Sequence, residues 1–274
     1  MSLTADRIAL ADQAIQRTFA AACVAWQVLP QWDVGDPGRV NVGREIRFAF
    51  DGAAPAGLPD PLFAGAAFAT KQVPVRPESV GFTMTLAQAT SARADALLTA
   101  VVARATDLAR KVDKDILTAL AKVPAGGWAK PAPGDAKSQE LAKTLLDARA
   151  LLEDSGYRAP TCLLADTGYH SSINRFENDV YIAPGMLMAA NANSLFRSSA
   201  LGDLVLLGRA QEIPHGVAAG ASPGEEPVDL AVAVPPSLEV VNEGDEIELA
   251  LRVRYALRVK DERGIVKIAG PAPV

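Results

Sequence analysis

The residue types that most often carry enzyme chemistry are scarce in this sequence. It holds only two histidines and two cysteines among 274 residues. His170 stands beside Ser171 and follows Asp166, but no Gly-x-Ser-x-Gly nucleophile elbow surrounds this serine. A helix-surface position for His170 is therefore favoured over a Ser-His-Asp triad. His215 follows a proline and precedes a glycine, so we expect it in a loop.

Motifs that bind nucleotides or metals do not occur either. The sequence has no Gly-x-x-x-x-Gly-Lys phosphate loop, no Gly-x-Gly-x-x-Gly turn and no His-Glu-x-x-His pair. Two lone cysteines and two lone histidines do not supply the ligand spacing of a zinc site. Cys23 and Cys162 lie in apolar surroundings and are expected to be buried free thiols in a reducing compartment rather than a disulfide. We predict no catalytic, cofactor-binding or metal-binding residue.

Clusters of charged residues favour solvent-exposed positions over binding sites. Asp113 and Asp115 are two positions apart in a predicted helix, hence on different faces, and are interpreted as solvated charges. An acidic run near the C-terminal strand is better explained by a turn and solvent-facing strand positions than by a Ca²⁺ site. It consists of Glu243, Asp245, Glu246 and Glu248. A solvated face is likewise favoured over a phosphate-facing surface for the basic residues Arg104, Arg110, Lys111, Lys114 and Lys122.

The composition is that of a globular, water-soluble protein. Hydrophobic residues make up 49%, charged residues 22% and aromatic residues 5% of a chain long enough for one or two domains. The formal net charge of −5 argues against a free-standing nucleic-acid-binding domain, which is usually basic. No signal peptide is visible, and no apolar run approaches the ~20 residues of a membrane span. We therefore expect a soluble, cytoplasmic protein.

A long amphipathic helix is the element around which the chain is organised. From about Thr90 to Val123, apolar residues recur at intervals of three and four and form one broad stripe. Thr90 and Ser91 are candidate N-caps, and Pro124 ends the helix. At ~1.5 Å per residue, this helix would be roughly 45–50 Å long.

Extended segments lie on both sides of this helix in the sequence. Residues 4–22 predict a short amphipathic helix, and Val40–Phe50 with residues 66–75 predict a two-stranded arm with a Gly/Pro-rich tip. Val80–Leu86 alternates as a half-buried strand. From Ile247 to Val259 every second residue is apolar, which predicts a strand of about 40 Å that packs with the long helix.

Between these segments, residues 124–235 alternate helices and strands and predict an α/β subdomain. The expected elements are a loop at 124–137, a helix from Ser138 to Gly156, a strand at Thr161–Ala165, a helix capped by Asp166 or Thr167 that continues through Phe176, a helix near Met186–Phe196, strands at Leu204–Gly208 and Leu230–Val234, and a loop at 214–226. A turn at 260–264 and a short strand at 265–268 follow the long C-terminal strand.

This order of elements resembles the major capsid proteins of tailed bacteriophages with the Hong Kong 97-type fold, and the encapsulin shell proteins that share it. The resemblance implies an α+β fold of four parts. Residues 1–39 would be an N-terminal arm and helix, and 40–79 the extended E-loop. Residues 80–123 and 236–274 would form the peripheral (P) domain with its spine helix, and 124–235 the axial (A) domain.

Local phrases agree with this resemblance. Ser155–Leu164 is similar to the stretch that precedes a central A-domain strand, and Leu206–Arg209 resembles a "LLGRP" phrase with Ala210 in place of proline. Arg252–Tyr255 lies where family members carry similar alternating sequences. Val40–Arg44 is reminiscent of the encapsulin phrase "VNLGR", whereas residues 1–16 lack the basic segment and "LAPI"-like phrase usual in encapsulins.

The resemblance implies a structural protein that is not an enzyme and needs no cofactor. Hexamers and pentamers would form around A-domain tips at 180–200 and 214–226, enclosing double-stranded DNA in a virion assembled in the bacterial cytoplasm. The short N-terminus implies a separate scaffolding protein, and portal and decoration proteins are possible partners. No matching motif supports an isopeptide cross-link at Lys71. The alternatives are an encapsulin shell that encloses a cargo enzyme, an α/β enzyme with titratable groups in a pocket, and a monomeric ligand-binding protein.

Overall fold

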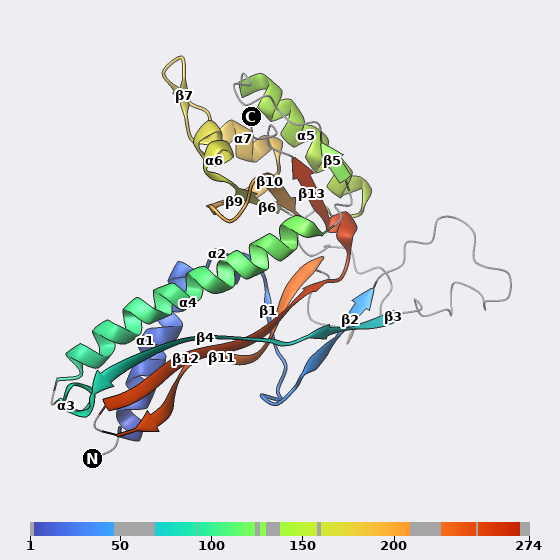
Figure 1. The fold of residues 1–274 in the computed structure, drawn as a ribbon. Helices are drawn as coiled ribbons and strands as arrows, with labels where there is room; N and C mark the ends of the chain where they lie inside the picture. Colours follow the sequence, from blue (N-terminus) through green and yellow to red (C-terminus); the bar gives the residue numbers. More distant parts are fainter. Residues whose placement is uncertain are drawn as a thin grey trace, which may run out of the picture. The chain divides into compact units, whose positions relative to one another are not determined.

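The computed structural model describes residues 3–46, 69–91, 93–123, 127–129, 138–157, 160–208, 226–244 and 246–268 (Figure 1). In chain order the elements are α1 (Ala5–Ala22), α2 (Val24–Val28), β1 (Gln31–Asp33), β2 (Asn41–Ile46), β3 (Ala69–Pro74), β4 (Arg76–Thr85), α3 (Leu86–Ala89), α4 (Asp95–Lys122), β5 (Gly127–Ala129), α5 (Ser138–Asp154), β6 (Thr161–Ala165), α6 (Thr167–Ile173), β7 (Phe176–Glu177), β8 (Val180–Tyr181), α7 (Ala183–Ala189), β9 (Ala192–Arg197), β10 (Leu204–Leu207), β11 (Val228–Glu243), β12 (Glu246–Val259), the 3₁₀ helix η1 (Glu262–Gly264) and β13 (Ile265–Ile268).

The chain divides into two units, each assembled from separate stretches of sequence. Unit 1 consists of Met1–Val42, Val73–Leu117 and Leu230–Leu257, and unit 2 of Gly43–Gln72, Thr118–Asp229 and Arg258–Val274.

The sheet of unit 1 joins both ends of the chain. Its strand order is β1-β11-β12-β4. β12 pairs antiparallel with β4 in a continuous register from Glu246 opposite Thr85 to Tyr255 opposite Arg76. The predicted association of the Val80–Leu86 strand with the long C-terminal strand is therefore confirmed.

Strand β11 is much longer than the predicted strand at Leu230–Val234, because it continues through two consecutive prolines to Glu243. Proline lacks a backbone donor and usually marks the end of a paired strand. The neighbouring strand β1, however, pairs with β11 only as far as Val232. Beyond that point β11 has an open edge, where proline is tolerated.

Helix α4 is the predicted spine helix, and its apolar stripe is buried as expected. The residues of this stripe within unit 1 that have no exposed surface are Leu97, Val101, Ala105, Leu108, Ala109, Val112, Ile116 and Leu117. On β12, Ile247, Leu249 and Leu251 are equally buried, whereas Glu246 and Glu248, on either side of Ile247, are exposed. Helix and strand thus bury the faces that their periods of 3.6 and two residues define.

The predicted start of this helix was wrong. Thr90 and Ser91 do not cap it, because Thr90 is instead the C-cap of a separate short helix, α3, which precedes the start of α4. Thr85 and Gln88 form a capping box at the start of α3, and the Thr90 hydroxyl donates to the carbonyl of Leu86 at its end. α4 therefore begins at Asp95, and its 28 residues span about 42 Å.

The N-terminal helix α1 is an integral part of unit 1. Its apolar residues Ala11, Ile15 and Phe19 are completely buried, which confirms the predicted amphipathic helix. Asp12 accepts a hydrogen bond of 2.7 Å from the backbone of Leu238 in β11. Arg7 donates to the carbonyls of Ala89 and Ser91, beyond the end of α3. The short helix α2 replaces part of the predicted irregular connection after α1.

The predicted two-stranded arm begins as β2 and β3, which form a sheet of their own. Val42 is buried against Val75 and Ala256, but Val40 is 65% exposed, so the predicted common face does not include Val40. The remainder of the arm, with its Gly/Pro-rich tip at 51–61, lies outside the described residues.

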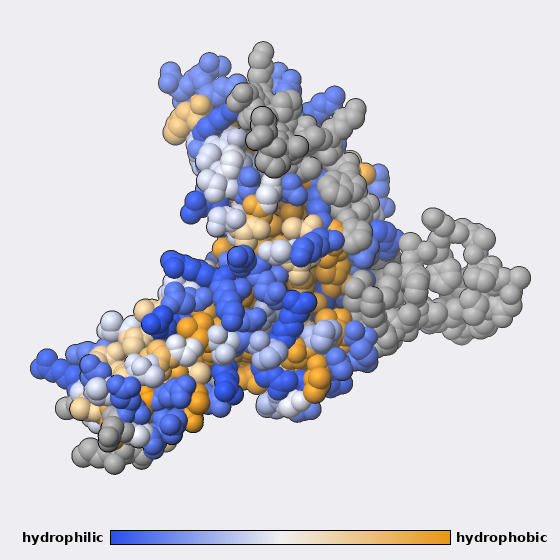
Figure 2. Space-filling view, viewed as in Figure 1, coloured by the Kyte–Doolittle hydropathy of each residue, from blue (hydrophilic) through white to orange (hydrophobic). Residues whose placement is uncertain are grey.

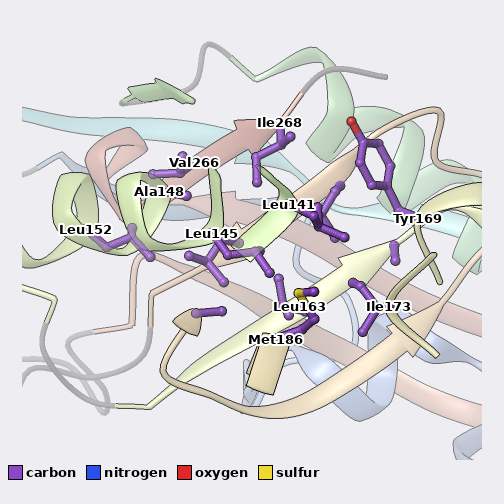
Figure 3. Close-up of a cluster of buried hydrophobic side chains, with 14 of the residues drawn as sticks. Leu141, Leu145, Ala148, Leu152, Leu163, Tyr169, Ile173, Met186, Val266 and Ile268 are labelled. Carbon is purple, nitrogen blue, oxygen red and sulfur yellow. The ribbon is translucent and has the colours of Figure 1, made fainter. Parts of the chain in front are cut away.

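Unit 2 is built on a mixed five-stranded sheet of order β5-β13-β10-β6-β9. β10 pairs antiparallel with both β13 and β6, and β6 pairs parallel with β9. The apolar face of α5 packs on this sheet together with residues of α6 and α7 (Figure 3). The cluster contains Leu141, Leu145, Ala148, Leu152, Leu163, Tyr169, Ile173, Met186, Val266 and Ile268.

In unit 2, the residues predicted to cap two of the helices are found at their ends. α5 ends at Asp154, two residues before the predicted end at Gly156, and Gly156 with its φ of 91° terminates the helix. The backbone of Tyr157 donates to Leu152 and that of Gly156 to Glu153, the two bonds of a Schellman motif. The predicted strand at Thr161–Ala165 matches β6, and Asp166 caps α6 as expected.

Other boundaries in unit 2 were predicted wrongly. α6 ends at Ile173 rather than Phe176, and the helix expected at Met186–Phe196 is α7 followed by β9. Asn191, in the left-handed region with a φ of 50°, separates α7 from β9. A short strand, β5, lies within the predicted loop at 124–137.

Candidate functional surfaces

The residues considered for a catalytic triad serve the local structure of α6. The Asp166 carboxylate accepts a hydrogen bond of 2.6 Å from the backbone of Tyr169 as the N-cap of this helix. His170 is partly exposed on α6, and its Nε2 lies 3.2 Å from Nδ2 of Asn174. The predicted helix-surface position of His170 is confirmed, whereas His215 lies outside the described residues. The carboxylate that a triad would need is engaged by the backbone.

Both cysteines are buried free thiols, as predicted from their apolar surroundings. Burial raises the pKa of the Cys23 thiol far above its ordinary value, and the nearby Asp113 charge raises it further. Within the part of the chain that the structure describes, no three His, Cys, Asp or Glu side chains gather closely enough to hold a metal ion. Glu243, Glu246 and Glu248 are exposed on the ends of β11 and β12.

Asp113 was wrongly interpreted as a solvated charge. Its Oδ1 accepts a hydrogen bond of 2.6 Å from the backbone of Ala25, and its Oδ2 accepts one of 3.1 Å from Val24. The Cys23 thiol donates a third, of 3.3 Å, to Oδ1. A side chain of the spine helix therefore caps α2 from a distance in sequence. Burial raises the pKa of Asp113 above its usual value, opposed by the backbone hydrogen bonds.

Asp115 likewise connects elements of unit 1 instead of facing only water. Its Oδ2 accepts a hydrogen bond of 2.8 Å from the hydroxyl of Tyr255 on β12. Arg76 at the start of β4 donates to the same carboxylate at 2.8 Å. One turn away, Lys111 forms a 2.6 Å ion pair with Glu78 on β4. These charges hold the spine helix on the strands, whereas the solvated-face interpretation fits the exposed pair Arg104–Asp107.

Unit 2 also contains a buried ion cluster that was not predicted from the sequence. The guanidinium of Arg258 donates two hydrogen bonds, of 2.6 and 2.7 Å, to the two oxygens of Asp229. Lys260 lies 3.2 Å from the same carboxylate. All three side chains are at least nine-tenths buried. The pairing offsets the cost of burying these charges, and removing one partner would leave a buried charge uncompensated. The polar atoms of the cluster are used within the fold.

Lys267 caps the end of α4, and its position in an apolar run is a signal in the sequence for such a role. It interrupts the apolar run Ile265–Ile268, an unusual place for a charge. Its ammonium donates to the carbonyls of Ala121 and Val123 at the end of α4. A cation at this position satisfies acceptors that the last helical turn leaves open.

A shallow groove of about 520 Å³ lies in unit 1 between β4, β11 and β12. Its charged groups are engaged with each other and with the backbone. Arg252 pairs with Glu239, Glu78 pairs with Lys111, and Arg254 donates to backbone carbonyls at 37 and 39. The groove does not bring together the unpaired acid and base that general acid–base catalysis requires.

Several large apolar side chains are exposed, and three of them share one hairpin. Phe176, Val180 and Tyr181 of β7–β8 are 72%, 62% and 46% exposed. In Figure 2 the region of this hairpin, at the upper left, shows pale orange side chains beside blue ones. Among the residues that the structure describes, the other exposed large apolar side chains are Leu10, Val40, Val102, Leu146, Met188 and Val241.

Comparison with known proteins identifies one family across most of the chain. The sequence profile described as "Phage capsid protein" matches residues 71–268. No curated protein matches the sequence. Within the described ranges, no helix combines the length and apolar character that a membrane span requires.

Three solved structures have a similar fold at low sequence identity. A virus-like particle from Pyrococcus furiosus superposes with a TM-score of 0.69 at 11% identity, over 96% of this chain and 98% of that one. A phage-related protein from Bordetella bronchiseptica gives 0.62 at 10% identity, over 93% and 95%. The capsid of Myoviridae phage XM1 gives 0.57 at 10% identity, over 89% and 90%.

Proposed function

We propose a function from the premise that this chain belongs to the phage capsid protein family, whose profile covers residues 71–268, and has the Hong Kong 97-type fold. It is a structural shell protein. Our proposal is that it is the major capsid protein of a tailed bacteriophage, forming hexamers and pentamers of an icosahedral shell. It has no catalytic role and no cofactor in this proposal.

The family match carries this proposal, and the anatomy of the chain supports it. Unit 1 contains most of the spine helix α4 and of the long strand β12, whose apolar faces are buried and which are joined by the hydrogen bond from Tyr255 to Asp115. Charged residues of the groove and of the spine helix are used for internal pairing rather than for chemistry. A chain of this kind offers extended surfaces to neighbouring copies rather than a pocket to a substrate.

The four parts expected from the resemblance enter this proposal with their boundaries. Residues 1–39 are the N-terminal arm and helix, and 40–79 are the E-loop, which would lie over a neighbouring subunit. Residues 80–123 and 236–274 are the P-domain, and 124–235 are the A-domain around the axes of hexamers and pentamers.

The partners follow from the same premise. Double-stranded DNA would be packaged in the virion through sequence-independent contacts with the spine-helix side of the shell. Assembly would take place in the cytoplasm of the bacterial host, with a separate scaffolding protein and with portal and decoration proteins as further partners. None of these partners requires a membrane.

A second candidate is the shell protein of an encapsulin nanocompartment, which would enclose a cargo enzyme instead of DNA. The encapsulin-like phrase Val40–Arg44 favours it. Both candidates use the same shell chemistry and differ in contents.

Electron microscopy of the purified protein, with nuclease treatment, tests both candidates. Closed icosahedral particles hundreds of ångströms across are expected for either. Nuclease-protected double-stranded DNA in native particles supports the phage capsid, and protein cargo supports the encapsulin. A homogeneous 28.7 kDa monomer, even with scaffolding protein added, would refute the shell function.

A further inference from the structure

We infer that the open edge of β11 is a surface on which a second copy of the chain would pair strand to strand, and that Pro236 and Asp12 keep this edge closed. β11 continues to Glu243, but its neighbour β1 pairs with it only over Leu230–Val232. An unpaired strand edge presents backbone donors and acceptors that another strand can use. All the residues concerned belong to unit 1.

Backbone hydrogen bonds show which residues of β11 face this edge. The N–H of Leu230 donates to the carbonyl of Pro30 at 2.9 Å, and the carbonyl of Val232 accepts from Val34 at 2.9 Å. Successive residues of a strand direct their backbone polar groups to alternate sides. The even-numbered positions from 234 to 242 therefore face the edge, whereas the odd-numbered positions face β12, the neighbour on the other side.

Two consecutive donors in the middle of this edge are withheld from a partner. Pro236 has no backbone N–H, so it interrupts the row of donors between positions 234 and 238. The next donor, the N–H of Leu238, is used within the chain, because it bonds Oδ1 of Asp12 at 2.7 Å. This bond also agrees with the side that the alternation assigns to Leu238. A second strand would meet a gap of two ladder hydrogen bonds at the centre of the edge.

Helix α1 holds the acceptor of Leu238 in place. Ala11 and Ile15, which precede and follow Asp12 in this helix, are completely buried within unit 1. The backbone nitrogen of Leu3, just before α1, lies 3.5 Å from Oε1 of Glu243 at the end of β11. Coverage by a helix and a proline in the strand are two ways in which proteins prevent edge-to-edge pairing. The edge of β11 uses both.

The sequence around the prolines indicates why the partner to be excluded is a second copy. The apolar run Leu230–Val234 precedes the two prolines, and Leu238–Val241 follows them with Glu239 as its one charge. This charge is paired with Arg252 on β12. Apolar, strand-forming segments of low charge pair readily with copies of themselves, and proline beside them opposes this. Two identical edges could pair antiparallel about a two-fold axis.

The test compares the wild type with two double variants. The opening variant, Asp12→Ala with Pro236→Val, frees the N–H of Leu238 and restores a donor at 236 with a residue that suits a strand. The control variant, Asp12→Asn with Pro235→Val, keeps an amide oxygen for Leu238 and places the new donor on the side of β12. Circular dichroism and thermal melting confirm that both variants fold.

Sedimentation velocity and thioflavin T fluorescence follow association of dissociated subunits at equal concentrations. We expect the opening variant to associate at least about tenfold faster than the wild type, because two further edge donors become available to a partner. The control variant should associate like the wild type. Electron microscopy separates irregular or fibrous aggregates from closed particles, so that shell assembly is not counted as edge pairing.

Two results of this comparison would refute the closure of the edge. One is an opening variant that associates no faster than the wild type. The other is a control variant that associates as fast as the opening variant, because its new donor does not lie on the open edge.

A third substitution distinguishes edge pairing from aggregation through misfolding. Val240→Pro, added to the opening variant, removes the donor at the next even-numbered position, where proline costs no ladder hydrogen bond with β12. We expect this triple variant to return to the wild-type rate of association. Aggregation of unfolded chains would not be slowed by a further proline that leaves the fold less stable or unchanged. Association of the triple variant as fast as that of the opening variant would therefore overturn the inference.

Discussion

The hydroxyl of Tyr255 donates a 2.8 Å hydrogen bond to Oδ2 of Asp115 and thereby joins strand β12 to the spine helix within unit 1. Tyr255 is 1% exposed, so its hydroxyl needs a protein partner. Burial raises the pKa of Tyr255 well above its ordinary value, and the hydrogen bond to Asp115 raises it further. The phenol of Tyr255 therefore stays protonated and can donate this hydrogen bond throughout the physiological range.

Replacing Tyr255 by Phe should lower the free energy of unfolding by about 1.5–3 kcal/mol, because a hydrogen bond to a buried or half-buried charge is lost without creating a cavity. Urea denaturation followed by circular dichroism measures this loss. The matched control is Tyr181→Phe, because the hydroxyl of the exposed Tyr181 bonds the neutral side chain of Asn174. Equal losses for the two variants would contradict a special role of Asp115.

Replacing Asp113 by Ala should destabilise the chain by about 1–3 kcal/mol, because the backbone donors of Val24 and Ala25 lose the acceptor that caps α2. On the same helix, Asp107→Ala removes only an exposed pair with Arg104 and should cost about 0–0.5 kcal/mol. Hydrogen exchange at residues 24 and 25 should rise in Asp113→Ala only. Unchanged protection there would rule out the capping role.

Gly264 should not tolerate a side chain. A Cβ atom at this position would lie 2.6 Å from Cγ of Pro227 and 3.0 Å from the ring of Tyr157. Gly264→Ala is therefore expected to lower the free energy of unfolding by about 1–3 kcal/mol through overpacking. Gly202→Ala is the control, because nothing lies within 4 Å of the point that its Cβ atom would occupy. Thermal melting of the two variants side by side gives the answer, and similar melting temperatures would contradict the prediction.

Acid should weaken unit 2 partly through Asp261. Burial raises the pKa of this carboxyl, but hydrogen bonds from Arg263 and Tyr157 outweigh it and hold the pKa below its usual value. A carboxyl with a lowered folded-state pKa stabilises the protein above its unfolded pKa of about 3.9. This contribution is lost as the pH falls through the folded-state value.

Asp261→Asn should therefore be less stable than the wild type at pH 7, and the difference should shrink as the pH falls below about 4. Urea midpoints of both proteins between neutral and acidic pH measure this convergence. A constant difference between the two proteins at every pH would show that ionisation of Asp261 is not involved.

Much of the regular structure could be predicted because its signals are local. The stripe of α4 and the alternation of β12 depend only on periods of 3.6 and two residues, and both surfaces are buried as expected. The end of α5 at Gly156 follows from the left-handed conformation that glycine adopts easily. These patterns also carry the element order by which the family resemblance was found.

The misplaced boundaries have causes in the tertiary structure. β11 extends through its prolines because its neighbour β1 ends at Val232. The spine helix begins after its predicted start because Thr90 is the C-cap of α3. Predictions on the tip of the arm, on the loop at 214–226 and on Lys71 concern residues or side chains outside the described part of the chain. The domain boundaries stay predictions.

The sequence by itself determined which faces of α4 and β12 are apolar and the approximate length of these two principal elements. Only the tertiary structure decided the role of the charges. Asp113 meets its partners about 90 residues away, and Tyr255 meets Asp115 across 140 residues. The stability of a buried charge depends on the donors that folding brings to it, and neighbours in sequence do not reveal them. The exposed hairpin at Phe176–Tyr181 likewise became visible only once unit 2 had buried its other apolar residues without it.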